Sequence, residues 1–219
     1  RDVFEAESDP YDMSRFGPFV QQFGWDYVLE EFDKYVHPSR RLRTPYTDYL
    51  AQQGGALLTS YREQIKSVFR LTPEHWRGQT SVLPQEHDLT SFLAGEALNW
   101  LGARGKDKPF LLKLAFVQPH VPLIDDPDWA DYYRDADIAL PELTPPSATN
   151  AAWQSYVDKL NGHSQVQMMD DAFIRNGIRH YLGMVSLIDQ KVGEVLAHLR
   201  ETGELDNTVI IFTSDHGET

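Results

Sequence analysis

The sequence predicts an α/β protein with a mostly parallel central sheet flanked by helices. Two segments carry this prediction, residues 89–117 and residues 178–213, and each reads as an amphipathic helix followed by a short apolar stretch. Such a stretch is typical of a strand covered on both faces. The alternation of helix and strand favours parallel strands, because a helical crossover brings the chain back in the same direction.

The first helix is predicted over residues 89–104 from the spacing of its apolar side chains, and Gly105 breaks the pattern. The apolar positions are Leu89, Phe92, Leu93, Ala97, Trp100 and Leu101. The strand that follows is predicted over residues 109–117, where nearly every residue is apolar.

The second helix is predicted over residues 178–199, where an apolar stripe recurs at helical spacing, and Gly203 closes it. Asp206-Asn207 is predicted to form a turn, and residues 208–213 to form a buried strand. Elsewhere, residues 46–53 are predicted to form a short helix stopped by Gly54.

Composition narrows the class of protein. The chain has 219 residues, of which 41% are hydrophobic and 12% aromatic, so it can build a sizeable core. It contains no cysteine, which excludes disulfides and thiolate metal sites within these residues. The net charge of −13 argues against nucleic-acid binding. No apolar run approaches the length of a membrane span, and no signal peptide is recognisable. The compartment and the oligomeric state stay open.

The best candidate for chemistry is the pair Asp215 and His216, directly after the second predicted strand. A carboxylate and an imidazole suit a divalent cation, and Gly217 lets the backbone turn beside them. The alternative is an Asp that caps a turn next to a solvated His. Context favours the metal site, because ligands gather beyond the carboxyl ends of parallel strands.

His120 lies after the first predicted strand, between Pro119 and Pro122, and is expected at the same edge of the sheet. The prolines restrict the backbone and so fix the direction of the imidazole. We interpret His120 as a general acid or a contact to an anionic group, with an ordinary loop histidine as the alternative.

Weaker candidates stand earlier in the chain. His87 is a possible substrate contact, while Asp88 or Thr90 is expected to cap the helix that follows. The segment from Val36 to Arg40 nearly matches a Cys/Ser-x-Pro-Ser-Arg nucleophile motif, but Val36 has no nucleophilic atom. No nucleophile is therefore assigned within these residues.

Two segments have the most distinctive sequences, H-Y-L-G-M-V-S-L-I-D-Q-K-V-G-E-V-L (180–196) and D-N-T-V-I-I-F-T-S-D-H-G-E (206–218). They resemble the sulfatase family of the alkaline phosphatase superfamily, including choline-sulfatase-like, arylsulfatase-like and phosphonate monoester hydrolase-like bacterial members. Residues 108–122, 83–92 and 44–50 are similar to further segments of the family. The resemblance implies that residues 1–219 are the central part of one catalytic domain, incomplete at both ends.

Within that domain, residues 1–80 are expected to be an irregular, partly helical insert, and residues 81–219 the α/β core with a loop-rich insertion over 121–173. The resemblance also implies a mechanism. A formylglycine nucleophile attacks a sulfate ester while a divalent cation neutralises the ester oxygens. By this resemblance Asp215 and His216 match two metal ligands, and His120 matches a residue that contacts the anionic group or assists the leaving group.

The cation implied is calcium, with manganese, magnesium and zinc as alternatives, and the substrate is a small-molecule or carbohydrate sulfate ester. The formylglycine is expected outside these residues, so this segment alone is expected to be inactive. Two alternatives stay open: a phosphonate or phosphate diester hydrolase on the same scaffold, and a non-catalytic relative that binds a metal or a sulfated ligand.

Overall fold

The computed structural model describes residues 16–31, 43–68, 77–140, 155 and 170–217. The longest elements are α9 (Asp171–Glu201), α6 (Leu89–Ala103) and α4 (Gly55–Val68). The shorter elements are α1 (Gly17–Gln21), α3 (Pro45–Gln53), α7 (Pro127–Tyr133), strands β1 (Gln79–Thr80) and β2 (Ile124–Asp125), and 3-10 turns at Gln85–His87 and Leu205–Asn207.

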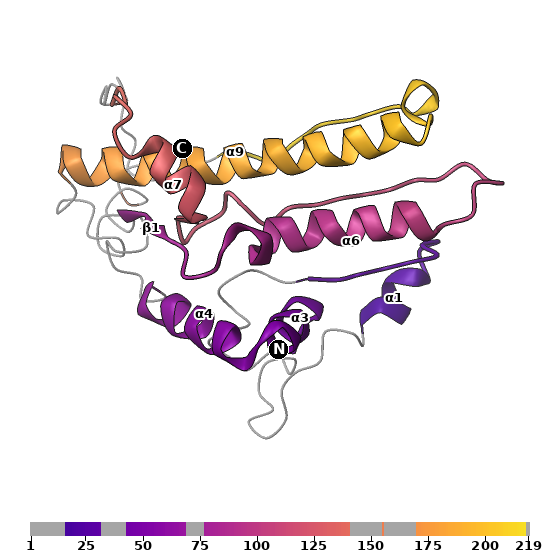
Figure 1. The fold of residues 1–219 in the computed structure, drawn as a ribbon, viewed down its shortest axis with the longest axis horizontal. Coiled ribbons are helices and arrows are strands. Elements are labelled where there is room, and N and C mark those ends of the chain that lie inside the picture. Colours follow the sequence, from indigo (N-terminus) through magenta and orange to yellow (C-terminus); the bar gives the residue numbers. More distant parts are fainter. Residues whose placement is uncertain (1–15, 32–42, 69–76, 141–154, 156–169, 218–219) are drawn as a thin grey trace.

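The helices lie in tiers (Figure 1). Helix α9 packs on α6 and runs in the same direction, while α3 packs on α4 in the tier beyond α6. Helix α7 packs across α9 and contacts the middle of that helix at Ser186 and Gln190. Helix α6 therefore lies between the other two tiers, which agrees with the high apolar content of its sequence.

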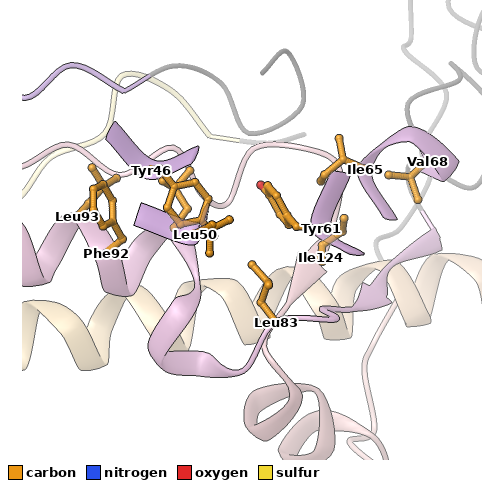
Figure 2. Close-up of a cluster of buried hydrophobic side chains, with 10 residues drawn as sticks. Tyr46, Leu50, Tyr61, Ile65, Val68, Leu83, Phe92, Leu93 and Ile124 are labelled. Carbon is orange, nitrogen blue, oxygen red and sulfur yellow. The ribbon is translucent and has the colours of Figure 1, made fainter. Parts of the chain in front are cut away.

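Hydrophobic side chains from α3, α4, α6 and β2 meet in one buried cluster (Figure 2). Tyr46 lies at its centre with no exposed surface, and its hydroxyl donates a 2.7 Å hydrogen bond to the carbonyl of His87. The polar end of the ring is thereby satisfied inside the core. The other buried members are Leu50, Tyr61, Ile65, Val68, Leu83, Leu89, Phe92, Leu93 and Ile124.

The sheet of the described residues is smaller than predicted. Strands β1 and β2 pair in parallel, with Gln79 opposite Ile124 and Thr80 opposite Asp125. The prediction of α/β structure with parallel pairing is thus confirmed on a small scale, but the larger central sheet is not formed within the described part of the chain.

The two predicted strands are extended segments without a sheet partner among the described residues. Over 110–116 exposure alternates along the chain, so that Leu114 and Phe116 pack on the core while Leu111 is 77% exposed. In segment 208–213, Val209 is 87% and Phe212 79% exposed. Burial on both faces was therefore the wrong expectation for these segments, because it needs neighbouring strands that the described residues do not supply.

Helix ends follow local capping chemistry. Thr44 and Thr47 form a capping box at the start of α3, and Gly54 ends this helix with φ 144°. Asp88 caps α6 by accepting a 2.7 Å hydrogen bond from the amide of Thr90, as predicted. Helix α6 ends at Ala103, since Arg104 is already extended, so Gly105 is not its terminator.

Helix α9 begins at Asp171, earlier than the predicted residue 178. Asp170 caps it through the amide of Phe173 at 2.8 Å. The predicted stripe began at Ile178 and so placed the start too late, although Phe173 and Ile174 in the first turn are also apolar. At the other end, Gly203 has φ 71° and follows the last turn, as predicted.

Helix α9 is long, yet none of the helices in the described ranges is apolar enough over its length to cross a membrane.

Truncating the core is expected to destabilise the chain. Leu50→Ala removes a fully buried side chain and should lower the free energy of unfolding by about 2–5 kcal/mol. Leu111→Ala, at a site that is 77% exposed, is the matched control and should change it by less than about 0.5 kcal/mol. Urea denaturation of both variants measures the difference, and equal losses would contradict this description of the core.

The carboxylate of Glu204 ties the ends of α6 and α9 together. It accepts hydrogen bonds from Arg104 and Thr202 and lies 3.4 Å from the Lys106 ammonium. The Arg104 hydrogen bond is the main reason why the pKa of Glu204 lies below its ordinary value of 4.5. Stability from this group is present above the pKa of the unfolded chain and is lost as pH falls through the folded pKa.

Glu204→Gln should therefore flatten the dependence of unfolding stability on pH in the acidic range. Thermal unfolding between pH 3 and pH 6 measures this dependence, in steps about one pH unit apart. Glu201→Gln, at the exposed end of α9, is the control and should keep the wild-type slope. A variant of Glu204 with the wild-type slope would show that the carboxylate is not stabilised by Arg104.

Candidate active site

Asp215 and His216 follow the second extended segment and are open to solvent, with side chains 88% and 66% exposed. The Oδ1 atom of Asp215 accepts a 2.9 Å hydrogen bond from the amide of His216. That hydrogen bond, followed by the charge of His216, lowers the pKa of Asp215. The carboxyl group is therefore ionised at neutral pH, as a ligand for a hard cation must be.

The chemistry of the pair fits a divalent cation, but the pair by itself is an incomplete site. A carboxylate oxygen and an imidazole nitrogen are two donors, whereas such cations take four or more. Across the part of the chain that the structure describes, no group of three His, Asp or Glu side chains is arranged to hold a metal ion. Asp215 and His216 thus supply at most part of a coordination shell.

His120 lies in a turn between two cis peptide bonds, Gln118-Pro119 and Val121-Pro122. Its side chain is half-buried, and its Nδ1 atom is 2.8 Å from the carbonyl oxygen of Val121. Because a carbonyl only accepts, this contact places a proton on Nδ1. The contact therefore selects one tautomer of the neutral ring and fixes its orientation.

The two candidate positions lie toward the same end of the molecule. In Figure 1 the extended segments 109–117 and 208–213 run in the same direction beside their helices and finish at the end of the molecule where α7 lies. His120 follows the first segment and Asp215-His216 the second. Asp215 Oδ1 and His216 Nδ1 each make a hydrogen-bond contact with an atom of residues 216–217. These contacts therefore do not link the pair to His120.

His87 ends the 3-10 turn before α6 and is held against α3. Its Nδ1 atom lies 2.8 Å from the hydroxyl of Tyr49, and the two rings meet edge-on at 5.7 Å. These contacts give His87 a packing role, and its role in substrate binding stays a prediction.

Three aromatic residues of α7 also have packing roles. Trp129 Nε1 donates to Gln190 of α9 at 3.3 Å, and the Tyr133 hydroxyl lies 2.9 Å from that of Ser186. Tyr132 packs edge-on against both rings. The segment around Val36 lies outside the described residues.

One pair of functional groups has no counterpart among the predicted site residues. Asp125 in β2 has no exposed surface, and its Oδ1 atom is 2.6 Å from Nδ1 of His180 in α9. Burial, the largest cause, raises the pKa of Asp125, and the hydrogen bond to His180 opposes that rise. The two residues are distant in sequence, so no local motif could reveal the pair.

The described residues place a carboxylate and imidazoles after two extended segments of an α/β chain, an arrangement that does not by itself define a class of protein. Comparison with known sequences makes the class specific. The model of the Sulfatase family matches residues 18–219, and this chain belongs to the sulfatase family. The family has an alkaline phosphatase-like α/β fold, of which the described helices and small parallel sheet represent a part.

Curated relatives agree with this assignment. The chain is 30% identical to an arylsulfatase of Clostridium perfringens over 133 residues, 59% of this chain and 26% of that protein. It is 33% identical over 150 residues to the multifunctional alkaline phosphatase superfamily protein PehA of Trinickia caryophylli, 63% of this chain and 29% of that protein. An endo-4-O-sulfatase of Bacteroides thetaiotaomicron is 26% identical across 100% of this chain, which spans 39% of that protein.

The chain thus spans between a quarter and two fifths of the length of these relatives, 26% to 39%. At the level of the family, the comparisons support hydrolysis of sulfate esters.

The partial donor set leads to a prediction about metal binding. Residues 1–219 should bind calcium with a dissociation constant weaker than about 1 μM, since two exposed donors cannot replace its hydration shell. Isothermal titration calorimetry measures the affinity, with Asp215→Asn as the variant that should abolish any residual heat. Sub-micromolar binding that Asp215→Asn abolishes would contradict the incomplete site.

Proposed function

We propose that the full-length protein carrying this chain is a sulfatase that hydrolyses a small-molecule or carbohydrate sulfate ester with the help of a divalent cation. The observation that carries this proposal is the Asp215-His216 pair beyond an extended segment, within the stretch that matches the Sulfatase family. The lowered pKa of Asp215 supports it, because the ionised carboxylate is the form that binds a cation.

In this proposal Asp215 and His216 are two of the metal ligands. A cation bound there supplies positive charge that neutralises the oxygens of the ester group. Calcium is the cation we propose, with manganese, magnesium and zinc as alternatives. Oxygen ligands favour calcium, whereas imidazole ligands also bind transition metals well.

His120 is proposed to contact the anionic group or to assist the leaving oxygen. Its half-buried position and the fixed orientation of its ring support this role. The nucleophile is proposed to be a formylglycine, made from Cys or Ser in a C/S-x-P-x-R motif. No such motif occurs in the 219 residues, so we propose that these residues alone lack activity. His87, half-buried beside Tyr49, is a secondary candidate for a substrate contact.

A second candidate activity is the hydrolysis of phosphonate or phosphate diesters on the same scaffold. Two observations favour this second activity. Asp215 is followed by His rather than Asn, and the similar protein PehA carries the word multifunctional in its name. A non-catalytic relative that binds a metal or a sulfated ligand is the third possibility, and it predicts a full-length protein without the nucleophile motif.

The proposal predicts that the full-length protein turns over an aryl sulfate, and that His120→Ala lowers kcat by roughly 10²–10⁴-fold, the usual contribution of one acid–base group. Asp215→Asn should lower activity and raise the calcium concentration needed for half-maximal rate. Asp128→Asn in α7 is the control and should leave the rate unchanged.

Spectrophotometric turnover of an aryl sulfate against a phenyl phosphonate ester separates the activities. Equal or greater phosphonate turnover would overturn the preference for sulfate, and the absence of any turnover in a protein that holds calcium would favour the non-catalytic alternative.

A further inference from the structure

The segment that carries His120 is tied down on both sides. It runs from Gln118, at the end of the first extended segment, to Asp126, the cap of α7. Gln118 is buried, and its Oε1 atom accepts a hydrogen bond from the hydroxyl of Thr90. Its Nε2 atom donates to Asp88 at 3.2 Å and to the carbonyl of Ile124 at 3.4 Å. The first end of the segment is thereby held to the beginning of α6.

Asp125 holds the other end. Its carbonyl accepts a 2.7 Å hydrogen bond from the amide of Ser81, next to β1, and its Oδ1 atom is 2.6 Å from Nδ1 of His180. Its Oδ2 atom is buried and, among the described residues, has no hydrogen-bond partner. Burial of a carboxylate oxygen without a hydrogen-bond partner costs free energy. The position of Asp125 therefore depends on the atoms packed around it.

Two glycines make the space for this pair. A Cβ atom on Gly183, in α9, would lie 2.2 Å from Oδ2 of Asp125. A Cβ atom on Gly78, which has φ 80°, would lie 2.2 Å from the ring of His180. Either side chain would force the pair to move. Gly193, farther along α9, has open space around it, so the close fit is a property of the pair and not of glycines in this helix generally.

The surroundings of the pair do not form a ready ligand site. A cavity of about 330 Å³ lies beside it and is lined by Arg134, Asn176 and Arg179 among others. Arg179 already donates to the carbonyl of Ala136, Asn176 to that of Gly78, and Arg134 pairs with Asp131. Asp125 and His180 also line this cavity, and the same two side chains join the loop that follows His120 to α9.

We propose that Asp125 and His180 are positioning residues that fix the His120 turn between α6 and α9, so that the imidazole of His120 meets the ester group in a single orientation. This inference rests on the proposed role of His120. Asp125 lies five residues beyond His120 in the chain, and the pair acts through the backbone of the turn. Displacement of a catalytic group by about 1 Å costs up to about 100-fold in rate, so such an anchor affects kcat more than KM.

The first test measures hydrogen exchange in the turn and does not depend on enzymatic activity. Asp125→Asn keeps the size of the side chain but removes its charge, and it should speed hydrogen exchange of the His120 and Ile124 amides by at least about tenfold. Both amides donate to carbonyls within the turn, Val117 and Pro122. Amides in the middle of α6 should keep their protection. Unchanged exchange in the turn would overturn the positioning role by itself.

A second variant distinguishes the loss of the anchor from general unfolding of the protein. Gly183→Ala leaves Asp125 and His180 in the sequence but pushes on the carboxylate, and it should loosen the same two amides. Gly193→Ala in the same helix is the matched control and should leave them unchanged. If both alanine variants behave alike, the anchor is refuted.

Kinetics of the full-length enzyme completes the test. Asp125→Asn and Gly183→Ala should lower kcat by about 10–100-fold with KM within about threefold of wild type. A purely structural role would lower the amount of folded enzyme and leave the kcat of the folded fraction unchanged. That result, together with strong loss in His120→Ala, would overturn the positioning role. Full activity of His120→Ala would instead refute the proposed function of His120, and the two failures are therefore distinct.

Discussion

The burial of α6 on two sides is the constraint on which the rest of the structure depends. Leu89, Phe92 and Leu93 enter the cluster around Tyr46, while the same helix packs on α9. A helix in this position has no freedom to slide or rotate, since its side chains interlock with both neighbours. Asp88 and Thr90 at its first turn are consequently fixed points, and the turn that carries His120 is attached to them through Gln118.

The same logic applies at the other end of α6. The guanidinium of Arg104, 8% exposed, pairs with Glu204 and lies over the ring of Phe110 at 4.1 Å. This contact joins the end of α6, the end of α9 and the beginning of an extended segment. Alignment of the two helices is therefore determined at both ends, by the hydrogen-bond network around Gln118 and by the ion pair at Glu204.

Helices and their ends were largely predictable from the sequence, because the signals are local. The apolar stripes located α6 and α9, and Asp88, Gly54 and Gly203 marked boundaries by chemistry that depends on a few neighbouring residues. The start of α9 was predicted too late, although Asp170 is a recognisable cap and Phe173 and Ile174 in the first turn are apolar. Sheet structure was harder, since a strand is defined by a partner elsewhere. Segments 109–117 and 208–213 are extended as predicted, yet β1 and β2, which do pair, are two residues long and gave no periodic signal.

The candidate site shows the same division. Asp215-His216 and His120 were singled out as candidates because each belongs to a short stretch with its own pattern, an apolar run that ends in polar residues. Asp125 and His180 were not, since each looks ordinary alone: an Asp before a helix cap, and a His within an amphipathic helix. Only folding brings them to 2.6 Å and shows that Gly183 and Gly78 leave room for them. The candidates Asp215-His216 and His120 leave local traces in the sequence, whereas the Asp125–His180 pair is defined by three-dimensional packing. A buried carboxylate–imidazole pair packed against two glycines is thus a better guide to such positions than any spacing in the sequence.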